Sequence, residues 1–497
     1  MQRITKLLDS FERSPISFWL CLLSLFLIVL AFHGRPIPSN NEFIYLLRLD
    51  PGFLPNDWSF SHSANEHWLF NLIFSIPASF LSIEIVGWLG RIAFWNLCLA
   101  ALLKLGNRWD IPSWAATISI GIWLAFNQSV VNAEWILGGF EAKVPAYVFL
   151  LFALVEFSKQ RIVLPAILLG LSFSFHPAVG IWAVPAVGLA LLVERISFAH
   201  FSKVVAMTFL ACLPGIIPLL TEQVAGQPAT TDLWHFMVTV QMPFHLDPYY
   251  FSKVGMFVLG VMLMFNIAAL WNANSFALRF FRIFQIAIAV FFLVGVLMRF
   301  LDLYSLLRFM PMRLFPILTP LFFMFTAFYL AAKLGSVQKK IVIGLIVVAT
   351  LFPLHPFDNA IGQMRETKAS WIAKPDDTEI CLKWISQNTP TDTTILTSPT
   401  GREFWYRSNR AQIVSYMYPR YDRLAEWRQR IADLTGNVQI ASRESSRSDI
   451  ETAFAKLSAA EIIEIKQKYA ANYLLTRTIY PFPVIFETET YKVYQLP

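Results

Sequence analysis

Long apolar runs constrain this chain more than any other feature of its sequence. A helix needs about 20 residues to cross a bilayer, and eleven runs reach or approach that length. They cover residues 16–33, 85–104, 113–131, 144–157, 162–175, 178–193, 203–221, 253–271, 283–300, 313–332 and 341–355. Apolar residues make up 56% of the chain and charged residues 15%, against about 45–50% and about 25% in soluble domains. The sequence therefore predicts a polytopic α-helical membrane protein with about 11 spans, and it excludes a soluble enzyme and a disordered chain.

Two further stretches need an interpretation. The first run, 16–33, is longer than the apolar core of a signal peptide and no small-x-small cleavage site follows it, so we interpret it as a retained span. The stretch 67–83 is apolar but contains Pro77, which interrupts a helix. We predict that it forms an interfacial or re-entrant helix within an outer loop covering residues 34–84.

The charges suggest an orientation. With the N-terminus inside, the inner segments carry 14 Lys and Arg and the outer loops 7, whereas acidic residues number 5 inside and 10 outside. This bias is typical of cytoplasmic loops, so the net charge of +7 does not indicate a nucleic-acid partner. The sequence predicts a multi-pass protein of the plasma (inner) membrane with a cytoplasmic N-terminus and an extracytoplasmic C-terminal domain.

The density of charged residues along the chain rises near residue 356. Residues up to 355 contain 22 Lys and Arg and 16 Asp and Glu, and the much shorter remainder contains 18 and 17. We predict a transmembrane domain over 1–356 and an aqueous α/β domain over 357–497, in which Cys381 is the only cysteine. The helices and strands expected there are helices 377–388 and 421–434, strands 394–397, 412–416, 473–476, 484–487 and 492–495, and two helices that start at the capping-box patterns 448–451 and 458–461.

Four carboxylates in the first two outer loops are candidates for chemistry. Glu42 and Asp57 lie in the first loop, where a carboxylate could take a proton from a hydroxyl or bind a cation. Glu134 and Glu141 lie in the second loop, and we predict that they bind an acceptor or an ion together with Lys143. The simpler alternatives are helix caps or solvated acids in the first loop and a surface ion pair beside a plain hairpin in the second.

Basic residues on the same side could recognise a phosphate. Arg299, Arg308 and Arg313 lie in one predicted outer loop, and guanidinium groups bind phosphates through paired, charge-assisted hydrogen bonds. His176 joins two apolar runs on this side and could contact a phosphate or orient a carboxylate. The alternatives are Arg side chains that reach ordinary lipid head groups and a purely structural histidine. No metal-ligand spacing occurs, and use of a divalent cation stays open.

Carboxylates and arginines at one membrane face suit transfer from a lipid-phosphate donor. The arginine stabilises the leaving phosphate and the carboxylate deprotonates the attacking hydroxyl. By the placement of Glu42 and Asp57, then Glu134 and Glu141, the chain resembles the GT-C superfamily of integral membrane glycosyltransferases. This superfamily includes protein O-mannosyltransferases, aminoarabinose transferases and the catalytic subunit of oligosaccharyltransferase.

The chain is similar over nearly its whole length to an uncharacterised group of bacterial multi-pass membrane proteins with a C-terminal domain of unknown function. The residues that carry this likeness are Leu54-Pro-Asn-Asp57-Trp58, His176-Pro177, Leu382–Pro390, Phe404–Arg410, Tyr469–Leu475 and Tyr491–Leu496. The group adds no assigned reaction to the interpretation.

The resemblance to the superfamily implies a glycosyltransferase that moves a sugar from a polyprenyl-phosphate donor to an acceptor, with inversion, at the outer face of the membrane. Asp57 would be the base or acceptor binder, with Glu42 second, and Arg308 and Arg313 would bind the lipid phosphate, with Arg299 nearby. Two other classes stay open: a transporter or flippase for a lipid-linked or anionic solute, and a non-catalytic membrane scaffold.

Overall fold

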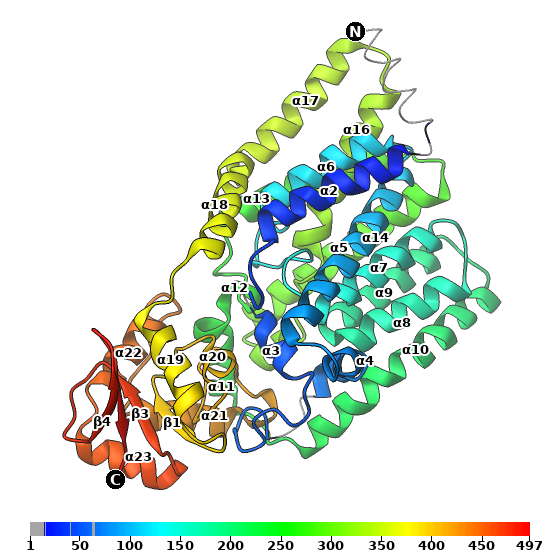
Figure 1. The fold of residues 1–497 in the computed structure, drawn as a ribbon. Coiled ribbons are helices and arrows are strands. Elements are labelled where there is room, and N and C mark those ends of the chain that lie inside the picture. The colour runs from blue at the N-terminus through cyan, green and yellow to red at the C-terminus, as the bar shows by residue number, and fades with distance from the viewer. Residues whose placement is uncertain (1–13, 15, 40, 62–64) are drawn as a thin grey trace. The chain divides into compact units, whose positions relative to one another are not determined.

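The computed structural model describes residues 14, 16–39, 41–61 and 65–497, and it is mostly helical with one small β-sheet (Figure 1). The basic side chains of residues 1–13, which enter the orientation argument, lie outside the described residues. Contacts divide the chain into two units. The helical unit comprises Met1–Glu42, Glu66–Ile217 and Phe244–Trp371, and the sheet unit comprises Phe43–Asn65, Pro218–Pro243 and Ile372–Pro497.

Each of the eleven predicted apolar runs forms a helix. Among the described residues, six helices are long and apolar enough to span a bilayer: α5 (Ile83–Asn107), α10 (Phe198–Ala225, apolar over Phe198–Thr221), α13 (Lys253–Leu270), α14 (Phe276–Phe300), α16 (Phe315–Lys333) and α17 (Val337–Leu351, continued to Leu354). The shorter helices are α2 (Ser17–His33), α4 (Trp68–Ala78), α6 (Ser113–Ala125), α7 (Lys143–Phe157), α8 (Val163–Phe175) and α9 (Pro177–Val193). The protein is therefore a multi-pass membrane protein, and the count of eleven spans stays a prediction.

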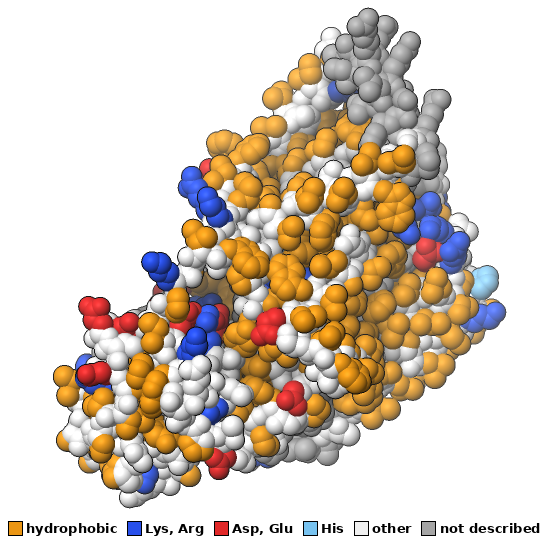
Figure 2. Space-filling view, viewed as in Figure 1, with side chains coloured by type: hydrophobic (Ala, Val, Ile, Leu, Met, Phe, Trp, Pro, Cys, Tyr) orange, Lys and Arg blue, Asp and Glu red, His pale blue; other side chains and the backbone are white. Residues whose placement is uncertain are grey.

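Burial separates the core helices from those on the surface of the helical unit. In α16 and α7 nearly every side chain is buried, including Pro320 and Tyr147, because these helices are covered on all sides. In contrast, α10 and α17 expose most of their apolar side chains. Figure 2 shows hydrophobic side chains covering much of the visible face of the helical unit with few charged groups among them, as expected for a surface that meets lipid tails.

One predicted span is shorter than expected, and the difference shapes the site. The apolar run 113–131 predicts a span of that length. In the structure α6 ends at Ala125, and residues 126–142 form a compact irregular loop. The Gln128 amide holds this loop together. Its Oε1 accepts hydrogen bonds from the backbone N–H groups of Ile136 and Leu137 at 2.8 Å each, and its Nε2 donates to the Leu137 carbonyl at 2.7 Å. The buried backbone is thus satisfied without a helix.

The sheet unit contains a five-stranded mixed sheet with the order β2-β1-β3-β5-β4. Its strands are β1 (Thr394–Thr397), β2 (Ala411–Gln412), β3 (Tyr473–Thr476), β4 (Val484–Glu487) and β5 (Lys492–Gln495). β1 pairs in parallel with β2 and β3, in the register Ile395 to Tyr473, whereas β3–β5 and β5–β4 are antiparallel. The α-helices of its C-terminal segment are α19 (Asp377–Asn388), α20 (Phe404–Ser408), α21 (Leu424–Leu434), α22 (Ser446–Ala455) and α23 (Ala459–Tyr469), and α11 (Thr231–Phe236) lies in its 218–243 segment. The predicted small α/β region is confirmed.

Two local predictions in this unit differ from the structure. The capping box at Ser458 and Glu461 is confirmed, with both reciprocal hydrogen bonds formed. The one predicted at Ser448 is wrong, because α22 already begins at Ser446 and the Ser448 hydroxyl donates back to the Ser445 carbonyl at 2.9 Å. The strand expected over 412–416 reduces to β2, and the buried residues after it leave the sheet.

The helix α18 (Pro356–Ile372) belongs with the helical unit by its contacts. The Thr367 hydroxyl donates to the Phe32 carbonyl at 2.6 Å, and the Trp371 indole donates to the Gly34 carbonyl at 2.7 Å. The sequence predicts a domain boundary at 356/357, because the chain becomes polar there. The division by contacts falls at 371/372, so it groups α18 with the helical unit.

Candidate functional site

Four charged side chains gather inside the helical unit at the end of the 126–142 loop. Glu134 and Glu141 come from the loop, Lys143 opens α7, and Arg313 lies two residues before α16. All four are buried, with 7% or less of their surface exposed. We call them the charged cluster. Two carboxylates and two cations leave it formally neutral, which is the condition for burying so many charges together.

Glu134 is the anchor of the charged cluster. Its Oε2 lies 2.9 Å from the Arg313 guanidinium, and its Oε1 lies 3.7 Å from the Lys143 ammonium. Burial raises the pKa of Glu134, but the charges of Arg313 and Lys143 more than offset burial, so the net pKa is lowered. Glu134 is therefore ionised at neutral pH and holds the arginine in place.

Glu141 is held less closely than Glu134, although the buried Oε1 of Glu134 also lacks a hydrogen-bond partner among the described residues. Its Oε2 lies 3.4 Å from the Lys143 ammonium, and its buried Oε1 has no hydrogen-bond partner among the described residues. Burial raises the pKa of Glu141 to about 7, and Lys143 only partly opposes the shift. A buried carboxyl group with an open oxygen and a pKa near neutrality is suited to exchange a proton with a substrate.

Two histidines border the charged cluster. The His176 ring stacks on His67 with centroids 4.8 Å apart, and its buried Nδ1 has no hydrogen-bond partner in the described part of the chain. Burial, with the charges of Arg313 and His67, lowers the pKa of His176 well below its usual value, so the ring is neutral. His245 forms a 2.7 Å hydrogen bond between its Nδ1 and the Asn132 carbonyl, which ties a second segment to the loop.

Glu42, also in the helical unit, has a different environment. It is fully buried, and both its oxygens accept hydrogen bonds: Oε1 from Arg91 Nε at 2.8 Å and from the Phe140 N–H at 2.6 Å, and Oε2 from the Ser39 N–H at 3.0 Å and from Arg91 Nη2. Such saturation is typical of a structural ion pair. The catalytic role predicted for Glu42 stays a prediction, and its geometry favours a structural role.

Asp57 belongs to the sheet unit and is also saturated. Its Oδ2 accepts hydrogen bonds from the Trp405 indole at 2.7 Å and the Gln412 N–H at 2.9 Å, and its Oδ1 accepts from the Ser59 N–H at 2.7 Å. Burial raises its pKa to about 6, against the opposing effect of these donors. Asp57 thus fastens the first loop to the C-terminal α/β region within one unit, and its catalytic role stays a prediction that this geometry does not favour.

The other predicted phosphate ligands are held differently. Arg299 pairs with Asp247 at 3.0 Å and with Asp302 at 3.1 Å, and it lies over the Tyr249 ring at 4.6 Å. This network accounts for Arg299 structurally. Arg308 is half-buried, and burial lowers its pKa. Of the three predicted arginines, the structure brings Arg313 into the charged cluster.

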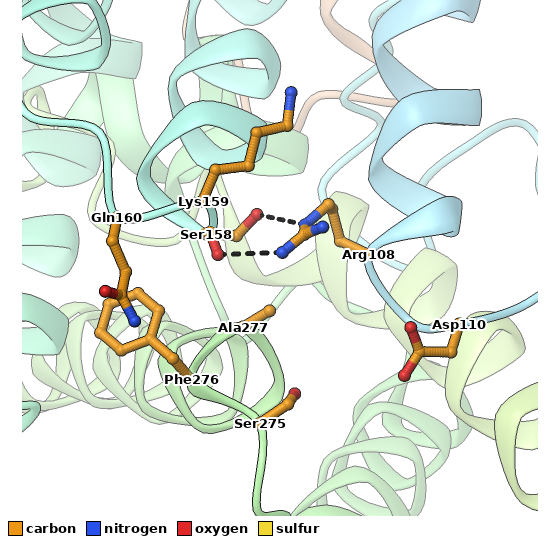
Figure 3. A pocket seen from close by; sticks show the side chains of 8 residues that line it. All are labelled: Arg108, Asp110, Ser158, Lys159, Gln160, Ser275, Phe276 and Ala277. Carbon is orange, nitrogen blue, oxygen red and sulfur yellow. Dashed lines mark hydrogen bonds between the residues drawn. The ribbon is translucent and has the colours of Figure 1, made fainter.

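A separate pocket of about 240 Å³ lies elsewhere in the helical unit. Arg108, Asp110, Ser158, Lys159, Gln160, Ser275, Phe276 and Ala277 line it (Figure 3). Arg108 donates from Nε to the Ser158 hydroxyl at 2.9 Å and from Nη2 to the Ser158 carbonyl at 3.1 Å. None of the site residues predicted from the sequence lines this pocket, which is formed by segments predicted to lie on the inner side.

Sequence reasoning missed the partners that matter most. Arg91 lies near the centre of an apolar run, where a charged side chain needs a partner of opposite charge. The structure shows that this partner is Glu42. Trp135 was missed because an aromatic residue in an apolar loop carries no signal of its own; its ring lies 3.5 Å from the Lys143 ammonium.

Comparison with known proteins agrees with this architecture. A family model described as a domain of unknown function (DUF6798) matches residues 376–434, and a search of curated protein sequences finds no match. Among solved structures, the chain is similar to the archaeal oligosaccharyltransferase AglB from Archaeoglobus fulgidus in complex with an inhibitory peptide and a dolichol-phosphate. The TM-score is 0.54 and the identity 13%, over 93% of this chain and 70% of that chain.

Two further structures are similar. The A. fulgidus oligosaccharyltransferase in complex with Zn and sulfate gives a TM-score of 0.51 at 14% identity, over 92% of this chain and 67% of that chain. The mycobacterial arabinofuranosyltransferase AftD gives 0.49 at 13% identity, over 94% of this chain and 37% of that chain. At these identities the likeness shows the fold alone. The two oligosaccharyltransferase structures, with TM-scores above 0.5, confirm at the level of the fold the resemblance to GT-C glycosyltransferases predicted from the sequence.

Proposed function

We propose that the protein is a GT-C-type glycosyltransferase that moves a sugar from a polyprenyl-phosphate donor to an acceptor at the outer face of the membrane. The single observation that carries the proposal is the charged cluster. It places an incompletely hydrogen-bonded carboxyl group, Glu141, beside a lysine that also contacts the arginine-paired Glu134. The protein has the fold of AglB, one structure of which holds dolichol-phosphate.

In the proposed reaction, the acceptor oxygen attacks the anomeric carbon of the sugar from the face opposite the phosphate. The bond between that carbon and the phosphate oxygen breaks, and the phosphate leaves with the electron pair. Glu141 takes the proton of the attacking hydroxyl, a role for which a pKa of about 7 is well matched. Arg313 and Arg308 stabilise the charge on the leaving phosphate. In this proposal Glu141 replaces Asp57 as the base.

The membrane placement is proposed with the function. The excess of Lys and Arg in the predicted inner segments supports eleven spans, a cytoplasmic N-terminus and an extracytoplasmic C-terminal domain in the plasma (inner) membrane. With this orientation the loop that carries Glu134 and Glu141 faces the side on which the proposed transfer takes place.

The test uses the purified full chain in nanodiscs with a panel of radiolabelled polyprenyl-phosphate sugars and hydroxyl acceptors. The wild-type protein is expected to transfer at least one sugar, and Glu141→Gln to reduce the rate by about 10²–10⁴-fold, the usual contribution of a general base. The matched control is Glu156→Gln, which changes another carboxylate that pairs with a lysine. The control is expected to keep the wild-type rate.

Two results would contradict the proposal. One is a wild-type protein that transfers no sugar from any donor of the panel while it moves a lipid-linked or anionic solute across the membrane. The other is a Glu141→Gln variant that keeps the wild-type rate, which would remove Glu141 from the reaction.

A further inference from the structure

Lys143 lies between the two carboxylates of the charged cluster. Its ammonium nitrogen is 3.4 Å from Glu141 Oε2 and 3.7 Å from Glu134 Oε1, and only 5% of the residue is exposed. Both contacts are longer than a charge-assisted hydrogen bond of about 2.7–2.9 Å. By contrast, Lys159 lies 2.6 Å from one oxygen of Glu156. The Lys143 ammonium is thus shared between two acids instead of being bound closely to one.

An aromatic ring closes a third side of this ammonium. The Trp135 ring centroid lies 3.5 Å from the Lys143 nitrogen, within the range of a cation–π interaction. The ring can occupy this position because residue 138 is glycine: a Cβ there would lie 2.5 Å from the Trp135 ring. Glu134, Trp135 and Glu141 therefore surround the Lys143 ammonium, and Gly138 leaves room for the ring.

A divalent cation would bind the same two carboxylates. Mg²⁺ and Ca²⁺ prefer oxygen ligands at about 2.0–2.6 Å, and two carboxylates facing one point are the usual beginning of such a site. Here that point already holds a cation. The described residues contain no group of three or more His, Cys, Asp and Glu side chains that could hold a metal. The residues present do not fit a divalent ion while Lys143 is in place.

Charge balance leads to the same conclusion. Glu134 and Glu141 carry two negative charges when ionised, and Lys143 and Arg313 carry two positive ones. A divalent ion added to this buried, neutral set would leave it with two uncompensated charges, which is costly in a medium of low dielectric constant. Removing Lys143 reverses the balance and leaves a net negative charge at the position of the ammonium.

We propose that Lys143 is a built-in cation that takes the place of a divalent metal ion between Glu134 and Glu141, so that this site works without one. The proposal rests on the proposed function for its meaning in catalysis, but not for its test. Lys143 acts as a positioning residue: it holds two carboxylates at a fixed separation and balances their charge beside the reacting groups.

The test measures Mn²⁺ binding to the full chain in detergent by the loss of the free-ion EPR signal. The wild-type protein is expected to show no saturable site tighter than about 1 mM. Lys143→Ala is expected to gain a site at least tenfold tighter, and Glu141→Gln in the same chain is expected to abolish it. Lys159→Ala is the matched control, because it frees a single carboxylate and should gain nothing.

Each outcome decides for or against the proposal. A wild-type site tighter than about 1 mM that Glu141→Gln removes would overturn it. So would a folded Lys143→Ala chain that gains no Mn²⁺ site, with folding checked by its elution profile and thermal transition. If Lys143→Ala does not fold, Lys143→Met replaces it, because methionine keeps the length of the side chain. If neither variant folds, the Mn²⁺ measurement on the wild-type protein decides alone.

The test is independent of sugar transfer. Mn²⁺ binding needs no donor and no acceptor, so a protein that transfers no sugar would contradict the proposed function and leave the binding result intact. Where transfer is found, a chelator is expected to leave its rate unchanged in the wild-type protein, and added Mn²⁺ is expected to restore part of the rate lost in Lys143→Ala.

Discussion

Two buried ion-pair sites of the helical unit use the same residue types in opposite ways. At Glu42, both carboxylate oxygens accept hydrogen bonds from Arg91 and from backbone N–H groups. At Glu141, one oxygen has no hydrogen-bond partner among the described residues, and the other has only a 3.4 Å contact with a shared lysine. Both carboxylates are buried, with 0% and 2% of the residue exposed, so burial does not distinguish them.

The number of hydrogen bonds that a buried carboxylate accepts, more than its burial or its charge, distinguishes a structural carboxylate from a candidate functional one. A buried group with all its hydrogen bonds formed stabilises one conformation and has no capacity left for a ligand. A buried group with an open oxygen bears a desolvation cost that a substrate can relieve.

The largest effect on stability is expected from Arg91→Leu. This change leaves the Glu42 carboxylate buried without its partner, which costs about 3–5 kcal/mol. Arg161→Leu is the matched control, because Arg161 also pairs with a glutamate but is 61% exposed at its side chain; an exposed pair contributes about 0–1 kcal/mol. Chemical unfolding of the purified protein measures the free energy of unfolding of both variants. An equal decrease in the two variants would contradict a special structural role of the buried Glu42–Arg91 pair.

A smaller loss is expected from Asp57→Asn in the sheet unit. The amide keeps the shape of the side chain but turns one acceptor oxygen into an N–H₂ donor facing the donors Trp405 and Gln412 or Ser59. An unsatisfied buried donor costs about 1–3 kcal/mol. Asp50→Asn is the control, since Asp50 is exposed and its Oδ1 accepts a hydrogen bond from the Gly52 N–H at 2.8 Å. If Asp57→Asn instead leaves stability unchanged and abolishes sugar transfer, Asp57 regains the catalytic role expected from the sequence.

The smallest effect concerns pH. Burial raises the pKa of Glu141 to about 7, and a general base must be deprotonated, so kcat/KM is expected to fall about tenfold per pH unit below that value and to level off above it. Between its usual pKa of 4.5 and about 7, Glu141 binds more protons in the folded state, so its contribution to the free energy of unfolding decreases as pH rises. A pH–rate profile that is flat between pH 5 and 8 would assign the base to another group.

Local signals in the sequence predicted much of the fold. Apolar run length located the long apolar helices of the helical unit, but not α18. The short strands and the Ser458 capping box were found because they depend on neighbouring residues alone. The first residues of the 126–142 loop, 126–131, were predicted as part of a span, whereas the rest of it was predicted as an outer loop. Its apolar residues match a helix, whereas its shape depends on three hydrogen bonds made by one amide, Gln128, which no periodic pattern reveals.

The candidate site was predicted in its parts. The sequence named Glu134, Glu141, Lys143, His176 and Arg313 because they lie in predicted outer loops at the membrane face, where carboxylates can exchange protons and guanidinium or imidazole groups can contact a phosphate. It could not tell them from Glu42 and Asp57, which have the same chemistry and a similar placement. The donor to Glu42, Arg91, lies 49 positions away along the chain, and the donor to Asp57, Trp405, lies 348 positions away.

By itself the sequence determined that this is a helical membrane protein with a polar α/β region, because hydrophobic length and local capping act over a few turns of chain. Only the tertiary structure decided which acid is satisfied and which is open. That outcome depends on hydrogen-bond donors from segments that are distant along the chain. A hydrogen bond forms only when donor and acceptor lie within about 3 Å, and only the folded structure brings such segments that close.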